Sequence, residues 1–330
     1  MKKIDFLAIG DTVIDAFINL EDVHIHCKID YAACELCVRF GDKVPYESVT
    51  VIPAVGNSPN AAVSAARLGL SSALASAVGK DKNGKECLST FKKEGVNTRL
   101  INADKNYPTN YHYVLRYDAE RTILTKHAPF QYKPLKSAKN VSWLYLSSLG
   151  DHSLSFHQEI EEFLRKNPKT KLSFQPGTYQ MSLGREKLKY FYERADIFIC
   201  NKEEANRILE TQIEDIKELL KKLSVLGPKI TVITDGPKGA YVFDKTKIWF
   251  TPMYPDPAPP VDRTGAGDAF ASTFTAAIAL GKTISEALAW GPINSMSVVQ
   301  YIGAREGLLT QEKLLEYLAK APADYKVKEI

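Results

Sequence analysis

The stretch PVDRTGAGDAFAS, residues 260–272, places two glycines and an aspartate where a helix should begin. Apolar residues then recur at helical spacing, at Phe270, Phe274, Ala277 and Ile278. Gly281 follows as a natural C-terminal stop. The spacing therefore predicts a helix over residues 264–280.

The first turn of this predicted helix is a candidate anion site. Its backbone N–H groups, those of Gly265, Ala266 and Gly267, would be donors without helical partners at the positive end of the helix dipole. Such a helix start binds phosphate oxygens, and glycine lets a phosphate approach the backbone closely. Asp268 then has two interpretations: it caps a packed helix, or it is a base that accepts a hydroxyl proton beside a bound phosphate.

Two other nucleotide-binding motifs do not fit the chain. The dinucleotide fingerprint needs a small residue at position 270, where Phe270 stands, and it belongs after a first strand rather than late in the chain. A Walker-type G-x-x-x-x-G-K-[ST] run occurs nowhere in the sequence. The helix start is therefore interpreted as an anion site of another kind.

Outside this stretch, short apolar runs alternate with helical patterns. Runs typical of buried strands lie at 3–10, 141–148, 171–176, 195–201 and 229–236. Helical patterns lie at 59–69, 83–95, 155–166, 202–225 with a break, 264–280, 283–301 and 310–320. This alternation predicts an α/β fold of three layers, in which a mainly parallel sheet has helices on both faces.

Two segments, at about 16–52 and 107–127, depart from the alternation. Both are rich in Val, Ile, Tyr and Thr, with period-2 character in YHYVLRY and RTILTKH. We predict that they form extra strands of a small β lid over the ligand cleft. The proline cluster at 254–262 is a stiff approach to the helix rather than a domain linker, so residues 1–330 are expected to form a single domain.

The composition is that of an ordinary globular protein of 330 residues, with 45% hydrophobic and 25% charged residues. The net charge of +4 comes from interleaved basic and acidic residues, which does not favour nucleic-acid binding. No run reaches the roughly 18 apolar residues that cross a bilayer, and Asp5 and Asp11 interrupt any signal-peptide core. We expect a cytoplasmic protein without nucleic-acid or membrane partners; its five cysteines do not indicate a disulfide framework.

Residues 262–270, DRTGAGDAF, resemble the C-terminal signature D-x-x-G-A-G-D-x-F of the ribokinase-like (PfkB) sugar kinase family. Further motifs of that family occur in the same order: GDTVID at 10–15, VGNSPNAAV at 55–63, VGKDKNG at 78–84, NKEEA at 201–205 and TDGPKGA at 234–240. Val55 replaces the usual first glycine of the second of these motifs. The resemblance covers about residues 3–310.

The resemblance implies an ATP-dependent kinase that phosphorylates a hydroxyl of a sugar or sugar derivative, with Asp268 as general base and the Gly265–Gly267 backbone as anion hole. The residues expected to bind the substrate are Asp11, Asp15, Gly56, Asn57, Asn60 and, as a stacking aromatic of the lid, Tyr113. Those expected to bind ATP and Mg²⁺ are Asn201, Glu204, Thr234, Gly236, Gly239 and Asn294, and a K⁺ site would include Asp262 and Thr264.

Alternatives stay open at this point. A nucleoside kinase of the same family is the second interpretation. A non-catalytic sugar- or nucleotide-binding regulatory protein is the third, which the intact Asp268 and glycines oppose. Asn201 and Glu204 also fit a plain helix N-terminus, and the lid strands are expected to join two copies in a homodimer.

The first lid segment contains His24, His26, Cys27, Cys34 and Cys37. Thiolate and imidazole groups at this spacing could bind zinc tetrahedrally. The alternative is that the cysteines pack as small apolar side chains in the lid strands and their connecting turn. The family pattern supplies no such site.

Overall fold

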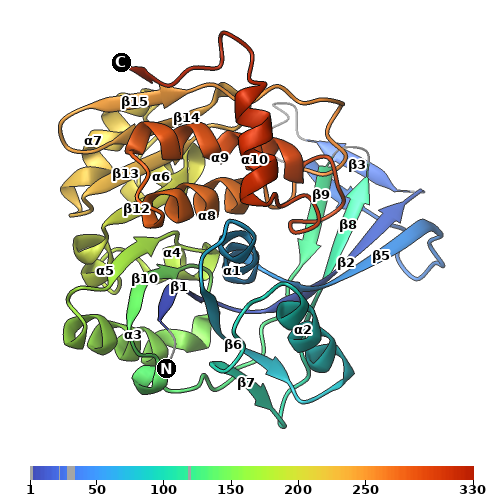
Figure 1. Cartoon of the computed structure of the whole chain (residues 1–330). Helices are drawn as coiled ribbons and strands as arrows, with labels where there is room; N and C mark the ends of the chain where they lie inside the picture. The colour runs from blue at the N-terminus through green and yellow to red at the C-terminus, as the bar shows by residue number, and fades with distance from the viewer. Residues whose placement is uncertain (1–2, 22, 28–33, 118–119) are drawn as a thin grey trace.

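The structure, a computed structural model, describes residues 3–21, 23–27, 34–117 and 120–330. Within these residues the main sheet has ten strands in the order β16-β15-β14-β13-β12-β11-β10-β1-β6-β7 (Figure 1). Their bounds are β1 Ile4–Ile9, β6 Ser72–Gly79, β7 Ile101–Asp104, β10 Val141–Leu146, β11 Lys171–Phe174, β12 Ile197–Asn201, β13 Ile230–Thr234, β14 Ala240–Phe243, β15 Ile248–Thr251 and β16 Lys328–Glu329. The sheet is parallel from β7 to β13, and β14 to β16 continue it antiparallel.

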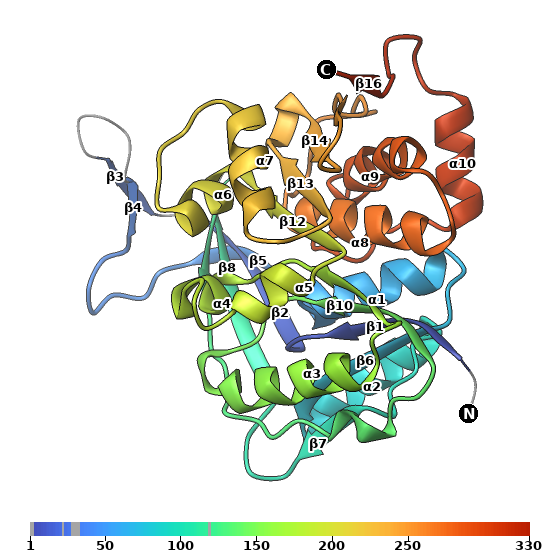
Figure 2. The same cartoon turned by 90° about the vertical axis from the view of Figure 1, so that its left-hand side faces the viewer.

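Helices cover both faces of this sheet (Figures 1 and 2). Successive side chains of β1 alternate between the two cores, with Phe6 and Ala8 in one and Leu7 and Ile9 in the other. The first face is covered by α1 Asn57–Arg67, α2 Lys82–Lys93, α8 Ala266–Ala279, α9 Ile284–Val298 and α10 Gln311–Ala319. The second face is covered by α3 Leu154–Lys166, α4 Thr178–Leu183, α5 Lys189–Arg194, α6 Lys202–Leu209 and α7 Ile216–Val225.

The three-layer α/β architecture expected from the sequence is confirmed. Each strand and helix expected from the alternation occurs, and the break expected within 202–225 separates α6 from α7. The elements not expected from the sequence are α4, α5, β6, β7, β14, β15 and β16. The residues of β6, SALASAVG, are all buried. Its small side chains show neither alternation nor β-branched character except at Val78, so the pattern that predicts strands is absent there. None of the described helices has the length and apolar character needed to span a membrane.

A second sheet, in the order β5-β2-β8-β9, forms the lid. Its strands are β2 Val13–Leu20, β5 Tyr46–Val55, β8 Asn110–Tyr117 and β9 Glu120–Leu124. The two segments expected to form a lid supply these strands, and their residues 22, 28–33 and 118–119 lie outside the described part of the chain. Three residues, 10–12, separate the end of β1 from the start of β2, so the lid leaves the main sheet directly beside the carboxyl end of β1.

The two faces of the lid sheet have different surroundings. Strand register gives the inner face Asp15, Phe17, His112 and Val114, and the outer face Ala16, Val51, Tyr113 and Leu124. On the inner face Phe17 and Val114 are buried, whereas Val51, Tyr113 and Leu124 on the outer face are exposed to 50%, 48% and 52%. Half-exposed apolar side chains thus form a row across the outside of the lid.

A hairpin of β3 His24–Cys27 and β4 Cys34–Cys37 stands away from the rest of the molecule (Figure 2). A disulfide joins Cys27 to Cys34. The zinc hypothesis is wrong in this structure, because two of the three expected thiolates are bonded to each other. The described residues also contain no group of three or more His, Cys, Asp or Glu side chains that could hold a metal ion. The expectation that the cysteines pack in a core is also wrong, because Cys34 is exposed and Cys37 is partly exposed.

Candidate active site

The N-terminus of α8 has the backbone geometry of an anion site. Gly265 precedes the helix at φ +82°, and a Cβ on it would lie 2.2 Å from the Cβ of Ala304, so only glycine fits. The amides of Gly265, Gly267 and Asp268 donate to no acceptor among the described residues, and the Ala266 amide lies 3.5 Å from the Arg263 carbonyl. These donors are available to an anionic group at the positive end of the helix.

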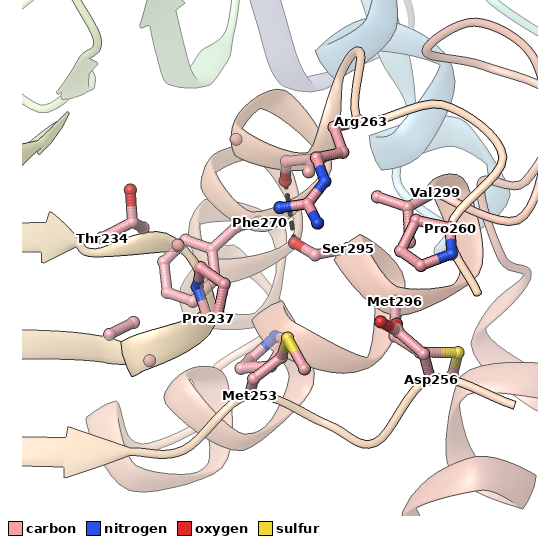
Figure 3. Close-up of a pocket in the computed structure, with 16 residues that line it drawn as sticks. Thr234, Pro237, Met253, Asp256, Pro260, Arg263, Phe270, Ser295, Met296 and Val299 are labelled. Carbon is pink, nitrogen blue, oxygen red and sulfur yellow. Dashed lines mark hydrogen bonds between the residues drawn. The ribbon is translucent and has the colours of Figure 1, made fainter. Parts of the chain in front are cut away.

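A cavity of about 530 Å³, here called the α8 cavity, opens beside these amides (Figure 3). Its lining includes Ala266 and Gly267 and three more of the residues expected to bind a nucleotide, Thr234, Gly236 and Gly239. The sequence analysis missed the rest of the lining: Pro237, Ala240, Met253, Asp256, Pro260, Arg263, Phe270, Pro292, Ser295, Met296 and Val299. A largely apolar cavity that ends at free backbone amides suits a flat ring system joined to phosphates.

Asn294 does not line the α8 cavity, so the expectation that it binds a nucleotide there is wrong in this structure. Its side chain is fully buried, its Nδ2 donates to Thr273 Oγ1 at 2.7 Å, and its Oδ1 accepts from the Leu309 amide at 2.9 Å. Both polar ends of the amide are therefore used to join α9 to α8 and to the segment before α10. One residue further along α9, Ser295 donates to the Ala266 carbonyl at 2.8 Å and steadies the first turn of α8 (Figure 3).

The carboxylate of Asp268 is held by three side-chain amides, and these four residues are here called the Asp268 cluster. Asn57 donates to Oδ1 at 2.9 Å, Asn60 to Oδ2 at 3.0 Å, and Gln175 to Oδ1 at 3.3 Å. The sequence analysis missed Gln175, which follows β11 and is itself oriented by the Tyr145 hydroxyl. Residues from three distant segments thus meet at one carboxylate.

Burial raises the pKa of Asp268 above its ordinary value of 3.8. The hydrogen bonds from Asn60, Gln175 and Asn57 oppose this shift, and the negative charge of Asp15 adds to it. Asp15 is therefore close enough to the Asp268 cluster to affect its charge. A carboxylate with a raised pKa is a better proton acceptor than an ordinary one, as a general base requires.

Gly56 places the two asparagines of the cluster. It precedes α1 at φ +122°, and a Cβ there would lie 2.6 Å from the Asp11 carbonyl oxygen, so the turn requires glycine. Asn57 and Asn60 then occupy the first turn of α1, on the side that meets α8. The expected residues Gly56, Asn57 and Asn60 are thus brought to Asp268.

The lid contributes Asp15 and His112, which face each other in register on its inner face. His112 Nδ1 lies 3.5 Å from Asp15 Oδ1. Tyr113 was expected at the substrate, but it is the next residue on β8 and lies on the outer face. That expectation is corrected here, because adjacent residues of a strand point to opposite faces.

The carboxylate of Asp11 is fully engaged within the protein. Oδ2 accepts from the Gly150 amide at 2.8 Å and contacts His127 Nδ1 at 3.1 Å, and Oδ1 accepts from the Tyr132 hydroxyl at 2.5 Å. We interpret Asp11 as a residue that holds the segments around His127, Tyr132 and Gly150 in position beside the Asp268 cluster. It has less capacity than Asp15 to accept further hydrogen bonds.

Asn201 and Glu204 form a capping box at the start of α6. Asn201 Oδ1 accepts from the Glu204 amide at 2.8 Å, and Glu204 Oε2 accepts from the Asn201 amide at 2.9 Å. Burial raises the pKa of Glu204, and the charge of Asp268 raises it further. No donor among the described residues contacts the other carboxylate oxygen of Glu204, and the carboxylate lies close enough to Asp268 for their charges to repel.

Asp262 and Thr264 lie together at the other side of the helix start. Asp262 is buried, its Oδ1 accepts from the amide and hydroxyl of Thr264 at 2.9 and 2.7 Å, and its Oδ2 accepts from the Gly303 amide at 2.9 Å. This network fixes the loop before α8 against the segment after α9. A K⁺ site at these residues stays a prediction.

Comparison with known proteins gives a family match over most of the chain. The model described as "pfkB family carbohydrate kinase" matches residues 25–311. A ribokinase of Haemophilus influenzae is 28% identical over 275 residues, which cover 81% of this chain and 87% of that protein. An ATP-dependent 6-phosphofructokinase of Thermoanaerobacterium thermosaccharolyticum is 25% identical over 317 residues, which cover 92% of this chain and 90% of that protein.

The same fold occurs in solved structures. The crystal structure of a nucleoside kinase from Methanocaldococcus jannaschii, an archaeal member of the ribokinase family, matches with a TM-score of 0.77 at 19% identity, over 97% of this chain and 100% of that one. Together with the family match over residues 25–311, these findings show that the chain belongs to the pfkB family of carbohydrate kinases, phosphotransferases that act on hydroxyl groups.

Proposed function

We propose that this protein transfers the terminal phosphoryl group of ATP to a hydroxyl group of a sugar or sugar derivative, with Asp268 as the general base. One observation supports this most directly. The first turn of α8 presents to the α8 cavity amides that have no acceptor among the described residues, and the Asp268 carboxylate on that same turn is held by side-chain amides from α1 and from Gln175, which follows β11. One turn of helix therefore adjoins both a phosphate-binding space and a polar site for the acceptor.

The proposed step is an in-line displacement. The acceptor hydroxyl gives its proton to Asp268 while its oxygen forms a bond to the terminal phosphorus, and the bond from that phosphorus to the leaving ADP oxygen breaks. The amides of Gly265 and Gly267 would donate to the transferring group, where charge is spread over its oxygens. The asparagines and Gln175 would hold Asp268 in position throughout.

The residues at the start of α6 fit Mg²⁺. Burial raises the pKa of Glu204, and the negative charge of Asp268 raises it further, so a cation near Glu204 would relieve an unfavourable concentration of negative charge. Mg²⁺ prefers carboxylate and water oxygens, and when bound it would neutralise charge on the ATP phosphates. Asn201 and Glu204 would hold it through water, and Asp262 and Thr264 with neighbouring carbonyls would hold K⁺.

A coupled assay of ADP release with ATP, Mg²⁺ and a panel of sugars and nucleosides tests the proposal. We expect saturable turnover with at least one acceptor, and phosphorylated product by mass spectrometry. Best turnover with a nucleoside would select the nucleoside kinase alternative. Binding of ATP and a sugar with no product from any acceptor would instead favour the non-catalytic alternative.

We also propose that two copies of the chain associate through the lid. The support is the row of half-exposed apolar side chains on its outer face, at Val51, Tyr113 and Leu124. Apolar area of this kind on a sheet face is a common basis for association.

A further inference from the structure

Two imidazole groups, His112 and His127, lie together beside the acceptor side of the Asp268 cluster, and we call them the histidine pair. Their ring centroids are 5.2 Å apart, and each ring has a carboxylate at its Nδ1: Asp15 for His112, at 3.5 Å, and Asp11 for His127, at 3.1 Å. The family signatures do not predict either histidine. In the sequence His112 lies between Tyr111 and Tyr113, and no motif marks it as a site residue.

The arrangement leaves the other nitrogen of each ring for a ligand. A carboxylate only accepts hydrogen bonds, so Nδ1 of His127 carries its proton toward Asp11 and Nε2 is the remaining polar atom. His112 is 8% exposed, and its Nε2 is buried without a hydrogen-bond partner among the described residues. Asn60 Oδ1, in the Asp268 cluster, is also buried without a partner there. Buried polar atoms without partners are rare, and a bound molecule with hydroxyl groups would supply the missing partners.

The charge of this region excludes one class of acceptor. Asp11, Asp15 and Asp268 give it three carboxylates, and none of them pairs with a lysine or arginine among the described residues. Two arginines among the described residues lie on the inner face of the lid sheet, Arg116 and Arg121, and they pair with each other across β8 and β9. Arg116 also pairs with Asn19, so both lie at a level about 13 Å along β2 from Asp15 at roughly 3.3 Å per residue. The Nη2 of Arg116 donates to the Val261 carbonyl at 2.8 Å. A phosphate or carboxylate placed beside these carboxylates would be repelled.

We propose that the histidine pair, with Asp15, contacts hydroxyl groups of the acceptor, and that the acceptor is an uncharged polyhydroxy compound rather than a sugar phosphate or sugar acid. This inference rests on the proposed kinase function and names the acceptor class for it. Asp15 accepts from one hydroxyl, and the free Nε2 of His112 bonds to a neighbouring one. His112 and His127 are specificity residues here, and the proton of the reacting hydroxyl still goes to Asp268.

Matched acceptors test the charge part of the proposal. Calorimetric binding and kcat/KM are measured for D-ribose against D-ribose 5-phosphate, for D-fructose against D-fructose 6-phosphate, and for cytidine. We expect at least one neutral compound to bind, and to exceed its phosphorylated counterpart tenfold or more in affinity. Preference for a phosphorylated member, or failure of every neutral compound to bind, overturns the proposal.

Substitutions on one strand test the histidine itself. His112→Phe keeps a ring and removes both nitrogens, so the acceptor KM should rise roughly tenfold or more while kcat and the KM for ATP change little. His112→Gln retains a polar group and should recover part of the affinity. Tyr113→Phe, on the opposite face of the same strand, is the control and should leave all three constants unchanged. A normal acceptor KM in folded His112→Phe overturns the role of His112.

Failure of the proposed kinase function gives a different result. In that case the wild-type protein forms no product, yet the neutral compound still binds and His112→Phe still weakens its binding in calorimetry. Turnover of wild-type protein with unchanged acceptor affinity in His112→Phe has the opposite meaning: the kinase function stands and the inference fails.

Discussion

Asp268 combines two properties that a general base needs and that a helix cap does not. Its carboxylate accepts from three amides, which fixes its direction, and burial raises its pKa, which increases its basicity. The backbone amide of Asp268 donates to no acceptor among the described residues. The side chain of Asp268 does not cap the helix, since α8 has no side-chain cap hydrogen bond. The capping interpretation considered from the sequence is therefore wrong for Asp268.

Asp268→Asn should lower kcat by roughly 10²–10⁴-fold, because an amide cannot accept the hydroxyl proton. Folding should be preserved, since the new amide can still accept from Asn57 and since Asn60, whose Oδ1 has no partner, can turn to accept from it. Turnover and thermal melting are measured on the same preparation. Near-normal turnover would rule out Asp268 as the base.

The pH dependence has a defined sign. The base must be ionised, so kcat should fall as the pH drops through the raised pKa of Asp268, which lies above 3.8. For stability the raised pKa favours the protonated folded state, a contribution present at low pH and lost as the pH rises through that pKa. At neutral pH, Asp268→Asn should therefore melt at the same temperature as the wild type or higher. A lower melting temperature at neutral pH that recovers in acid would contradict this assignment.

How far the sequence predicts the site differs from residue to residue. The pattern of a helix start located Gly265 and Asp268, because helix starts impose local sequence requirements. The resemblance to the family's motifs located Gly56 and Asn60. Gln175 and the histidine pair could not be located, since their roles depend on which strands become neighbours. The role of Asn294 was predicted wrongly for the same reason. Asn294 lies on a helix that flanks the cavity, but tertiary packing turns its side chain to the neighbouring helix.

At the scale of elements, the start of α8 contains two glycines with different physical roles. Gly265 needs positive φ and has no room for a Cβ beside Ala304, whereas a Cβ on Gly267 would meet nothing within 4 Å. Gly265 is therefore required by the backbone conformation, whereas Gly267 leaves space beside the α8 cavity.

Gly265→Ala should destabilise the protein by about 2–4 kcal/mol, because left-handed backbone strain adds to overpacking. Gly267→Ala should melt near the wild-type temperature but bind ATP more weakly, because its methyl group occupies space at the phosphate end of the cavity. Thermal melting and ATP calorimetry on both variants separate the two roles. Equal loss of stability in both variants would show that the two glycines do not differ in this way.

The elements themselves were predictable where side chains alternate or repeat. The helices around residues 264–280 and 283–301 follow from apolar periodicity, and the parallel strands from short apolar runs. β6 was not predictable in this way, because its residues SALASAVG are mostly small and show no alternation. The position of the lid was indicated by composition, whereas which side chains face inward depends on the register of β2 against β8.

For the whole molecule, association through the lid predicts a concentration-dependent dimer. Val51→Lys places a charge at the β5 end of the outer apolar row and should shift the protein to monomer in sedimentation or light scattering. Val225→Lys, at an 84% exposed position on α7, is the matched control and should leave the mass unchanged. A monomeric wild-type protein at all concentrations would dismiss the lid as an interface.

The short connection between β1 and β2 holds one end of the lid close to the main sheet, while the other end extends away from it. Gly10 lies in this connection, and a Cβ there would lie 2.4 Å from Oγ of Ser58 in the first turn of α1, so the connection is packed tightly against α1. Asp15 lies near this connection, whereas Leu20 at the end of β2 and its partner Tyr46 on β5 lie at the far end of the lid. A rotation of the lid about this connection would therefore displace the far end of the lid more than it displaces Asp15. In the proposed reaction, an acceptor hydroxyl bound to Asp15 would therefore move little when the far end of the lid moves, so that binding of the acceptor and its enclosure by the lid would be separate steps.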